Sequence, residues 1–151
     1  MRRVPLLFAW MFVVSVLVHF LWEMGQAFAY EMEGIPVATA VGFHLWATLG
    51  DGMLMWLQYG AVAAWRRDPL WIARPRWSDL LPLAAAGLAL SVGIEWRALA
   101  AARWSYTPAM PIVPGLGVGL LPVLQLLLLP WPIYWAAWRL CQPAAAPRPR
   151  P

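Results

Sequence analysis

Four long apolar stretches constrain how this chain of 151 residues can fold. About 20 helical residues cross the ~30 Å hydrocarbon core of a bilayer, so we expect membrane-spanning helices near residues 4–30, 37–64, 80–102 and 116–138. The chain is 62% hydrophobic and 12% charged, whereas about 25% of a soluble domain is charged. Pro122, Pro130 and Pro132 predict a kink or break in the last helix. The expected fold is an all-α integral membrane four-helix bundle.

Arginine placement predicts how the bundle is oriented. The net charge of +4 comes from arginine, because the sequence contains no lysine. The arginines cluster before the first span, between the second and third, and after the fourth, at residues 2–3, 66–76 and 139–150. Spans keep positive loops in the cytoplasm, so we expect an N-in/C-in topology. The sequence has no basic stripe on a soluble surface, so we do not expect nucleic acid as a partner.

The remaining composition bounds the organisation of the chain. We expect one four-transmembrane-helix domain at 1–142 and a disordered cytoplasmic tail at 143–151, which is rich in alanine and proline. A lone Cys141 excludes internal disulfides and cysteine-based metal clusters. A composition rich in Arg, Ala and Pro is typical of a high-GC bacterial genome. The predicted location is therefore the bacterial inner (cytoplasmic) membrane, in a multi-pass arrangement.

Acidic and histidine side chains interrupt the apolar stretches. His19 and Glu23 are four residues apart and share a helical face, and His44 and Asp51 lie on the second stretch. Glu95 lies on the third. A charge near the bilayer centre costs about 3 kcal/mol on insertion scales, so such residues usually have a function. Counting about 1.5 Å per residue places most of these groups in the outer half of the membrane, which predicts one site open to the extracytoplasmic side.

We assign candidate roles to these residues and their polar or aromatic neighbours. The candidate catalytic residues are Glu23, Asp51, His19, His44 and Glu95. The candidate ligand-binding residues are Gln26, Trp22, Trp46, Trp96, Arg97, Tyr106 and Gln125. Each has a simpler explanation: hydration at the interface, packing, an ion pair of Glu95 with Arg97, or hydrogen bonding between helices for Gln125. The loop at 104–114 either closes over the site or merely connects two helices.

The His19-x-x-x-Glu23 pair in a chain of four spans resembles the emopamil-binding-protein (EXPERA) group, and in outline the integral-membrane terpene cyclases. The resemblance implies that His19 and Glu23 handle protons and stabilise cationic intermediates of isomerisation. Asp51 could stand for a second acid. Gln125, followed by Pro130, is similar to an amide-then-proline pattern on the last helix, with Gln where that group has Asn.

A second resemblance covers more of the chain. The Trp22-Glu23-x-x-Gln26, Gly50-Asp51 and Trp104-x-Tyr106 patterns resemble short bacterial four-span membrane proteins of unassigned function. This resemblance implies the architecture and no particular chemistry.

Three functions remain open from the sequence. The first is binding or conversion of a lipophilic, isoprenoid-like molecule by acid–base isomerase or cyclase chemistry, in which a buried carboxyl donates a proton. The second is a small transporter or a protein that handles metal ions or protons through these N and O ligands. The third is a structural subunit or assembly factor of a membrane complex. We expect the lipid bilayer as a partner and no cofactor, and we assign no metal ligand; a homo-oligomer is left open.

Overall fold

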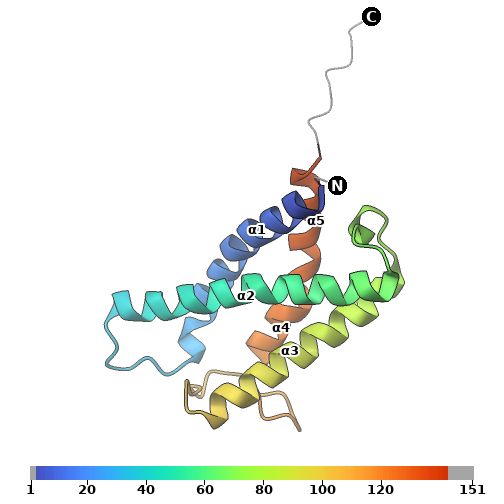
Figure 1. The fold of residues 1–151 in the computed structure, drawn as a ribbon. Coiled ribbons are helices and arrows are strands. Elements are labelled where there is room, and N and C mark those ends of the chain that lie inside the picture. The colour runs from blue at the N-terminus through green and yellow to red at the C-terminus, as the bar shows by residue number, and fades with distance from the viewer. Residues whose placement is uncertain (1–2, 143–151) are drawn as a thin grey trace, which may run out of the picture.

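The computed structural model describes residues 3–142, and the tail expected at 143–151 lies outside them. Over this range the chain is helical, with long helices joined by loops and short 3-10 turns (Figure 1). The α-helices are α1 (Arg3–Gln26), α2 (Val37–Arg66), α3 (Leu80–Ala100), α4 (Leu120–Leu128) and α5 (Pro130–Leu140). The 3-10 turns are η1 (Ala27–Ala29), η2 (Trp71–Ala73) and η3 (Trp77–Asp79).

Three helical segments are long and apolar enough to cross a membrane, and they indicate a membrane protein. They are Val4–Ala29, Trp77–Ala100 and Leu120–Leu140 among the described residues. α2 has 30 residues but is not one of the three, because polar side chains recur along it. The prediction of helices long and apolar enough to span a membrane is therefore confirmed for the first, third and fourth stretches.

The last span is interrupted at Leu129, as its prolines predict. α4 ends at Leu128 and α5 begins at Pro130. Because Pro130 has no N–H, the carbonyl of Leu126 loses its helical partner, and the Nε2 of Gln58 on α2 donates to it instead, at 3.0 Å. This side chain of a neighbouring helix satisfies the freed carbonyl, as transmembrane bundles require.

The start of the last helix differs from our prediction. Helix was expected from residue 116, but α4 begins at Leu120. Gly115 and Gly117 have φ of +79° and +68°, a left-handed conformation that glycine adopts without steric cost. Gly119 then pairs with Ile112 in an isolated antiparallel bridge. Residues 116–119, which we expected to be helical, are therefore part of a tight turn.

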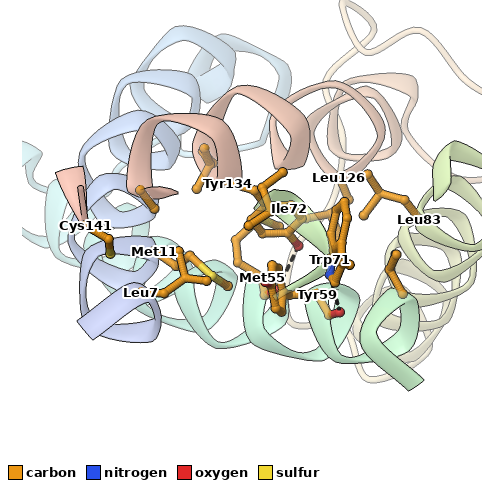
Figure 2. Close-up of a cluster of buried hydrophobic side chains, with 13 residues drawn as sticks. Leu7, Met11, Met55, Tyr59, Trp71, Ile72, Leu83, Leu126, Tyr134 and Cys141 are labelled. Carbon is orange, nitrogen blue, oxygen red and sulfur yellow. Dashed lines mark hydrogen bonds between the residues drawn. The ribbon is translucent and has the colours of Figure 1, made fainter. Parts of the chain in front are cut away.

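Helix packing divides the molecule into an apolar half and a polar half. We call the end where α1 begins and α5 ends the terminal end, and the end formed by residues 27–36 and 101–119 the loop end (Figure 1). Near the terminal end, buried side chains such as Met11, Met55, Tyr59, Trp71 and Tyr134 form the main core (Figure 2). The polar groups in this core are paired: the Tyr134 hydroxyl donates to the Met55 carbonyl at 2.8 Å, and the Trp71 indole to the Tyr59 carbonyl at 3.3 Å.

Candidate functional site

The half of the bundle toward the loop end holds the polar residues predicted from the sequence. The Nδ1 of His44 lies 3.0 Å from the Oε2 of Glu23, which joins α2 to α1. The Nδ1 of His19 lies 3.4 Å from the Oδ2 of Asp51, which joins the same two helices one to two turns away. The two pairs form because α1 and α2 run antiparallel and both carry polar residues at helical spacing on the facing sides.

Two amides connect these pairs to the broken fourth span. Gln125 on α4 donates from Nε2 to Asp51 Oδ2 at 2.8 Å and contacts His19 Nδ1 at 2.7 Å. Gln26 donates from Nε2 to Glu23 Oε1 at 2.8 Å and to Gln125 Oε1 at 3.1 Å. Each amide therefore uses both of its N–H groups, which is the full donor capacity of a glutamine side chain.

The direction of these hydrogen bonds assigns the imidazole tautomers. Since Gln125 donates to His19 Nδ1, a neutral His19 carries its proton on Nε2. An ionised Glu23 can only accept, so His44 donates from Nδ1 and its Nε2 keeps a lone pair. Both Nε2 atoms are buried and without a hydrogen-bond partner among the described residues. Of the two, His44 is therefore arranged as a proton acceptor, because Glu23 holds its Nδ1 and its Nε2 keeps a lone pair.

Glu95 on α3 is the third carboxyl and is held by the loop after that helix. The Tyr106 hydroxyl donates to Glu95 Oε2, and the Trp104 indole donates to the same oxygen at 3.2 Å. The backbone N–H of Gly119 donates to the Tyr106 oxygen at 2.9 Å. Burial, with a further contribution from Glu95, raises the pKa of Tyr106. The phenol therefore remains a donor at neutral pH.

Most of these groups line one cavity of about 570 Å³, but His19 and Tyr106 do not and contact it only through Asp51, Gln125 and Glu95. Glu23, Asp51 and Glu95 all line it, as do His44, Gln26 and Gln125. Much of the remaining wall is apolar and is contributed by Tyr30, Met32, Phe43, Ala47, Ile94 and Leu126. The structure thus brings together three acidic residues from three helices. An apolar pocket with a few convergent polar groups is the usual form of a small-molecule site.

The loops at the loop end are tied to each other beside this cavity. The Glu31 N–H donates to the Ser105 carbonyl, and the Thr107 N–H to the Ala29 carbonyl, both at 3.0 Å. Tyr30 and Tyr106 form an isolated antiparallel bridge. Trp104 from this loop lines the cavity. The loop therefore does more than connect two helices: it supplies part of the wall.

Of four further candidate ligand-binding residues, one lines the cavity and three do not. Trp46 lines it from its edge and is 75% exposed. Trp22 lies outside it but donates to Gln26 Oε1 at 3.1 Å. Contrary to our expectation, Trp96 and Arg97 do not line it, because both are exposed on the far side of α3. Trp96 donates to the Leu116 carbonyl instead, at 2.8 Å, and Arg97 forms no ion pair with Glu95.

Arg103 is a cavity residue that the sequence analysis missed. It lies just after α3 and lines the cavity near Trp104. Its position follows from the end of the helix, where Ala102 has φ of +50° and the Arg103 N–H donates back to the Ala98 carbonyl at 2.9 Å. The available signal was an arginine at the end predicted to be extracytoplasmic, where positive charge is unusual.

No group of three or more His, Cys, Asp or Glu residues within 3–142 is arranged to hold a metal ion. Comparison with known proteins adds no further assignment: no family model, no curated protein and no solved structure matches this chain. Its function must therefore be argued from the site itself.

Proposed function

We propose that this chain is a multi-pass protein of the bacterial inner membrane with four spans and both termini in the cytoplasm. The additional span is α2, whose 30 residues are enough for ~45 Å of helix. Its polar residues His44, Thr48 and Gln58 are buried, whereas Trp46 and Leu57 are 75% and 60% exposed. This distribution suits a helix that presents apolar side chains to lipid and polar ones to its neighbours.

We further propose that the cavity binds a lipophilic small molecule and converts it by acid–base chemistry. The observation that supports this best is the convergence of Glu23, Asp51 and Glu95 with His44 on one largely apolar cavity of about 570 Å³. Pockets for small molecules and cofactors have volumes of about 300–1,000 Å³. A site for a hydrophilic solute would need more polar wall than this one has.

The hydrogen bonds suggest which atoms transfer protons. Bonds from described residues reach Asp51 at Oδ2 and Glu95 at Oε2, so Asp51 Oδ1 and Glu95 Oε1 are free to meet a ligand. Of the two, a protonated Glu95 is our candidate acid. The Nε2 of His44, oriented by Glu23, is the candidate base.

The proposed reaction is an isomerisation in which a carbon–carbon double bond moves. Glu95 adds its proton to one alkene carbon, which leaves a carbocation on the other. His44 Nε2 then removes a proton from an adjacent carbon, and that C–H electron pair forms the new double bond. Proton return from His44 to Glu95 through the cavity restores the enzyme, so the reaction needs no oxidant or cofactor. The resemblance to the EXPERA group implies chemistry of this class.

Deuterium incorporation tests this proposal. The purified protein would be reconstituted in liposomes in D2O and incubated with uncharged isoprenoid alkenes, whose masses are then measured. We expect deuterium in at least one substrate with the wild-type protein and none with Glu95→Gln, which keeps the shape but cannot donate a carboxyl proton. Arg97→Gln is the matched control, because Arg97 lies on the same helix outside the cavity. Equal incorporation by Glu95→Gln and wild type would contradict the assigned acid.

A structural role is the second candidate, because Gln26 and Gln125 join α1, α2 and α4 through a continuous hydrogen-bond network. In a subunit or assembly factor these groups would hold helices together and nothing more. Deuterium incorporation into an isoprenoid distinguishes the two proposals, since a purely structural subunit would not catalyse it.

A further inference from the structure

We propose that the ligand enters the cavity sideways from the bilayer, through a groove between α1 and α4. We call it the lateral groove and define it by Leu21, Gly25 and Phe28 on one side and Leu121 and Leu129 on the other; its volume is about 480 Å³. This inference rests on the proposed function, because it assigns the route by which a lipophilic ligand reaches that same cavity.

The interrupted fourth span explains why a groove exists there. α5 packs against α1, but α4 packs chiefly against α3. The change of partner occurs at the break before Pro130, where two consecutive helices meet at Leu129. A gap is therefore left between α1 and α4 on the outside of the bundle, beside the polar site. Gly25 widens this gap, since a Cβ built on it would meet nothing within 4 Å.

The lateral groove faces hydrocarbon, which identifies its occupant as an apolar chain. Both walls belong to segments long and apolar enough to cross a membrane, Val4–Ala29 and Leu120–Leu140. Leu21 is 73% exposed and Phe28 is 63% exposed. Large exposed apolar side chains around a concavity are favourable only against another apolar surface. A prenyl or alkyl chain from the surrounding lipid meets that requirement.

Gln26 connects the lateral groove to the cavity, because it lines both. Its side chain is held by the Trp22 indole on the groove side and by Gln125 on the cavity side, each at 3.1 Å. Together with the bond from Gln26 Nε2 to Glu23 Oε1 at 2.8 Å, these side-chain hydrogen bonds hold Gln26 between the two volumes. A rotation of Gln26 about its own side-chain bonds would break them without moving a helix.

A photoreactive probe tests this route. Hexadecanol carrying a diazirine would be added to phosphatidylcholine liposomes that contain the full chain, and adducts would be located by peptide mass spectrometry after a flash. Adducts on Glu95 report entry into the cavity, because Glu95 is 4% exposed and lines that cavity. Adducts on Leu21, Gly25, Phe28, Leu121 or Leu129, none of which lines the cavity, report occupancy of the lateral groove.

The deciding variant is Gly25→Trp, which fills the lateral groove. The matched control is Gly93→Trp on α3, where a Cβ also meets nothing within 4 Å and which lines neither concavity. We expect Gly25→Trp to lose the adducts on Glu95 and Gly93→Trp to retain them. If Gly25→Trp does not fold, Gly25→Cys in a Cys141→Ala background would be alkylated with N-benzylmaleimide after folding, so that one sample is compared before and after blocking.

The outcomes separate this inference from the proposed function. If the lateral groove is filled and Glu95 is still labelled at the wild-type rate, the lateral route is wrong, while binding in the cavity stands. If wild type labels in the lateral groove but never on Glu95, the cavity does not take a lipophilic molecule and both proposals fail.

Discussion

The substitution Gln125→Leu would remove the amide that connects three helices while keeping nearly the same side-chain volume. Gln125 makes hydrogen bonds to Gln26, Asp51 and His19, all on other helices. Interhelical hydrogen bonds in membrane proteins average about 0.6 kcal/mol, so the loss of three costs about 2 kcal/mol. His19 adds to this, because it is 0% exposed and water cannot replace its partner, whereas Asp51 and Gln26 face the cavity. An unpaired buried group costs about 1–3 kcal/mol, which brings the expected total loss to roughly 3–5 kcal/mol.

Unfolding in bicelles with increasing sodium dodecyl sulfate would measure this loss. The matched control is Gln142→Leu, because Gln142 lies just after α5, is half-buried, and its side chain hydrogen-bonds among the described residues only to the Trp138 carbonyl of that helix, at 3.3 Å. We expect the control to stay within about 0.5 kcal/mol of wild type. A Gln125→Leu protein as stable as the control would refute the view that this amide holds the site together.

Three further predictions follow from the fold and the site. Gly87→Ala should destabilise the bundle by about 1–3 kcal/mol in the same assay, because its Cβ would clash with Gln58 and with the backbone of α4; no loss would contradict the close packing. Reporter fusions at Glu33 and Met110 should read as extracytoplasmic and at Arg74 as cytoplasmic, and a cytoplasmic signal at Met110 would overturn the topology. Asp51→Asn should insert and accumulate but convert the substrate more slowly, because Asp51 lines the cavity and an amide there cannot carry charge or a carboxyl proton, and Asp51→Leu should in addition lower abundance; a fully active Asp51→Asn would show that Asp51 takes no part in the conversion.

Periodicity within each helix was sufficient to predict which polar side chains of α1 and α2 lie on a shared face. His19 and Glu23 had to share a face of α1, as His44 and Asp51 had to share a face of α2, because residues three, four and seven apart align on a helix. The requirement that polar groups in a membrane find partners then predicted that these faces meet. The same rule explains why Trp96 and Arg97 lie outside the cavity: they follow Glu95 by one and two residues, and residues at that spacing do not share a helical face.

Features that depend on contacts between distant residues were beyond sequence reasoning. The break in the last span was predicted from its prolines, but not that Gln58 would satisfy the freed Leu126 carbonyl. The place of Arg103 depends on the left-handed Ala102, and alanine gives no sign of that conformation in a sequence. The lateral groove likewise depends on α4 and α5 packing against different helices.

Native mass spectrometry on protein released from its own membrane tests the central claim, which is that the cavity holds a lipophilic molecule. Ala47 lines the cavity, so Ala47→Trp would fill it, and Ala64→Trp on the same helix is the control outside it. We predict that the wild type and Ala64→Trp retain one apolar molecule per chain and that Ala47→Trp retains none. If Ala47→Trp carries the same molecule at the wild-type ratio, the cavity is not the binding site.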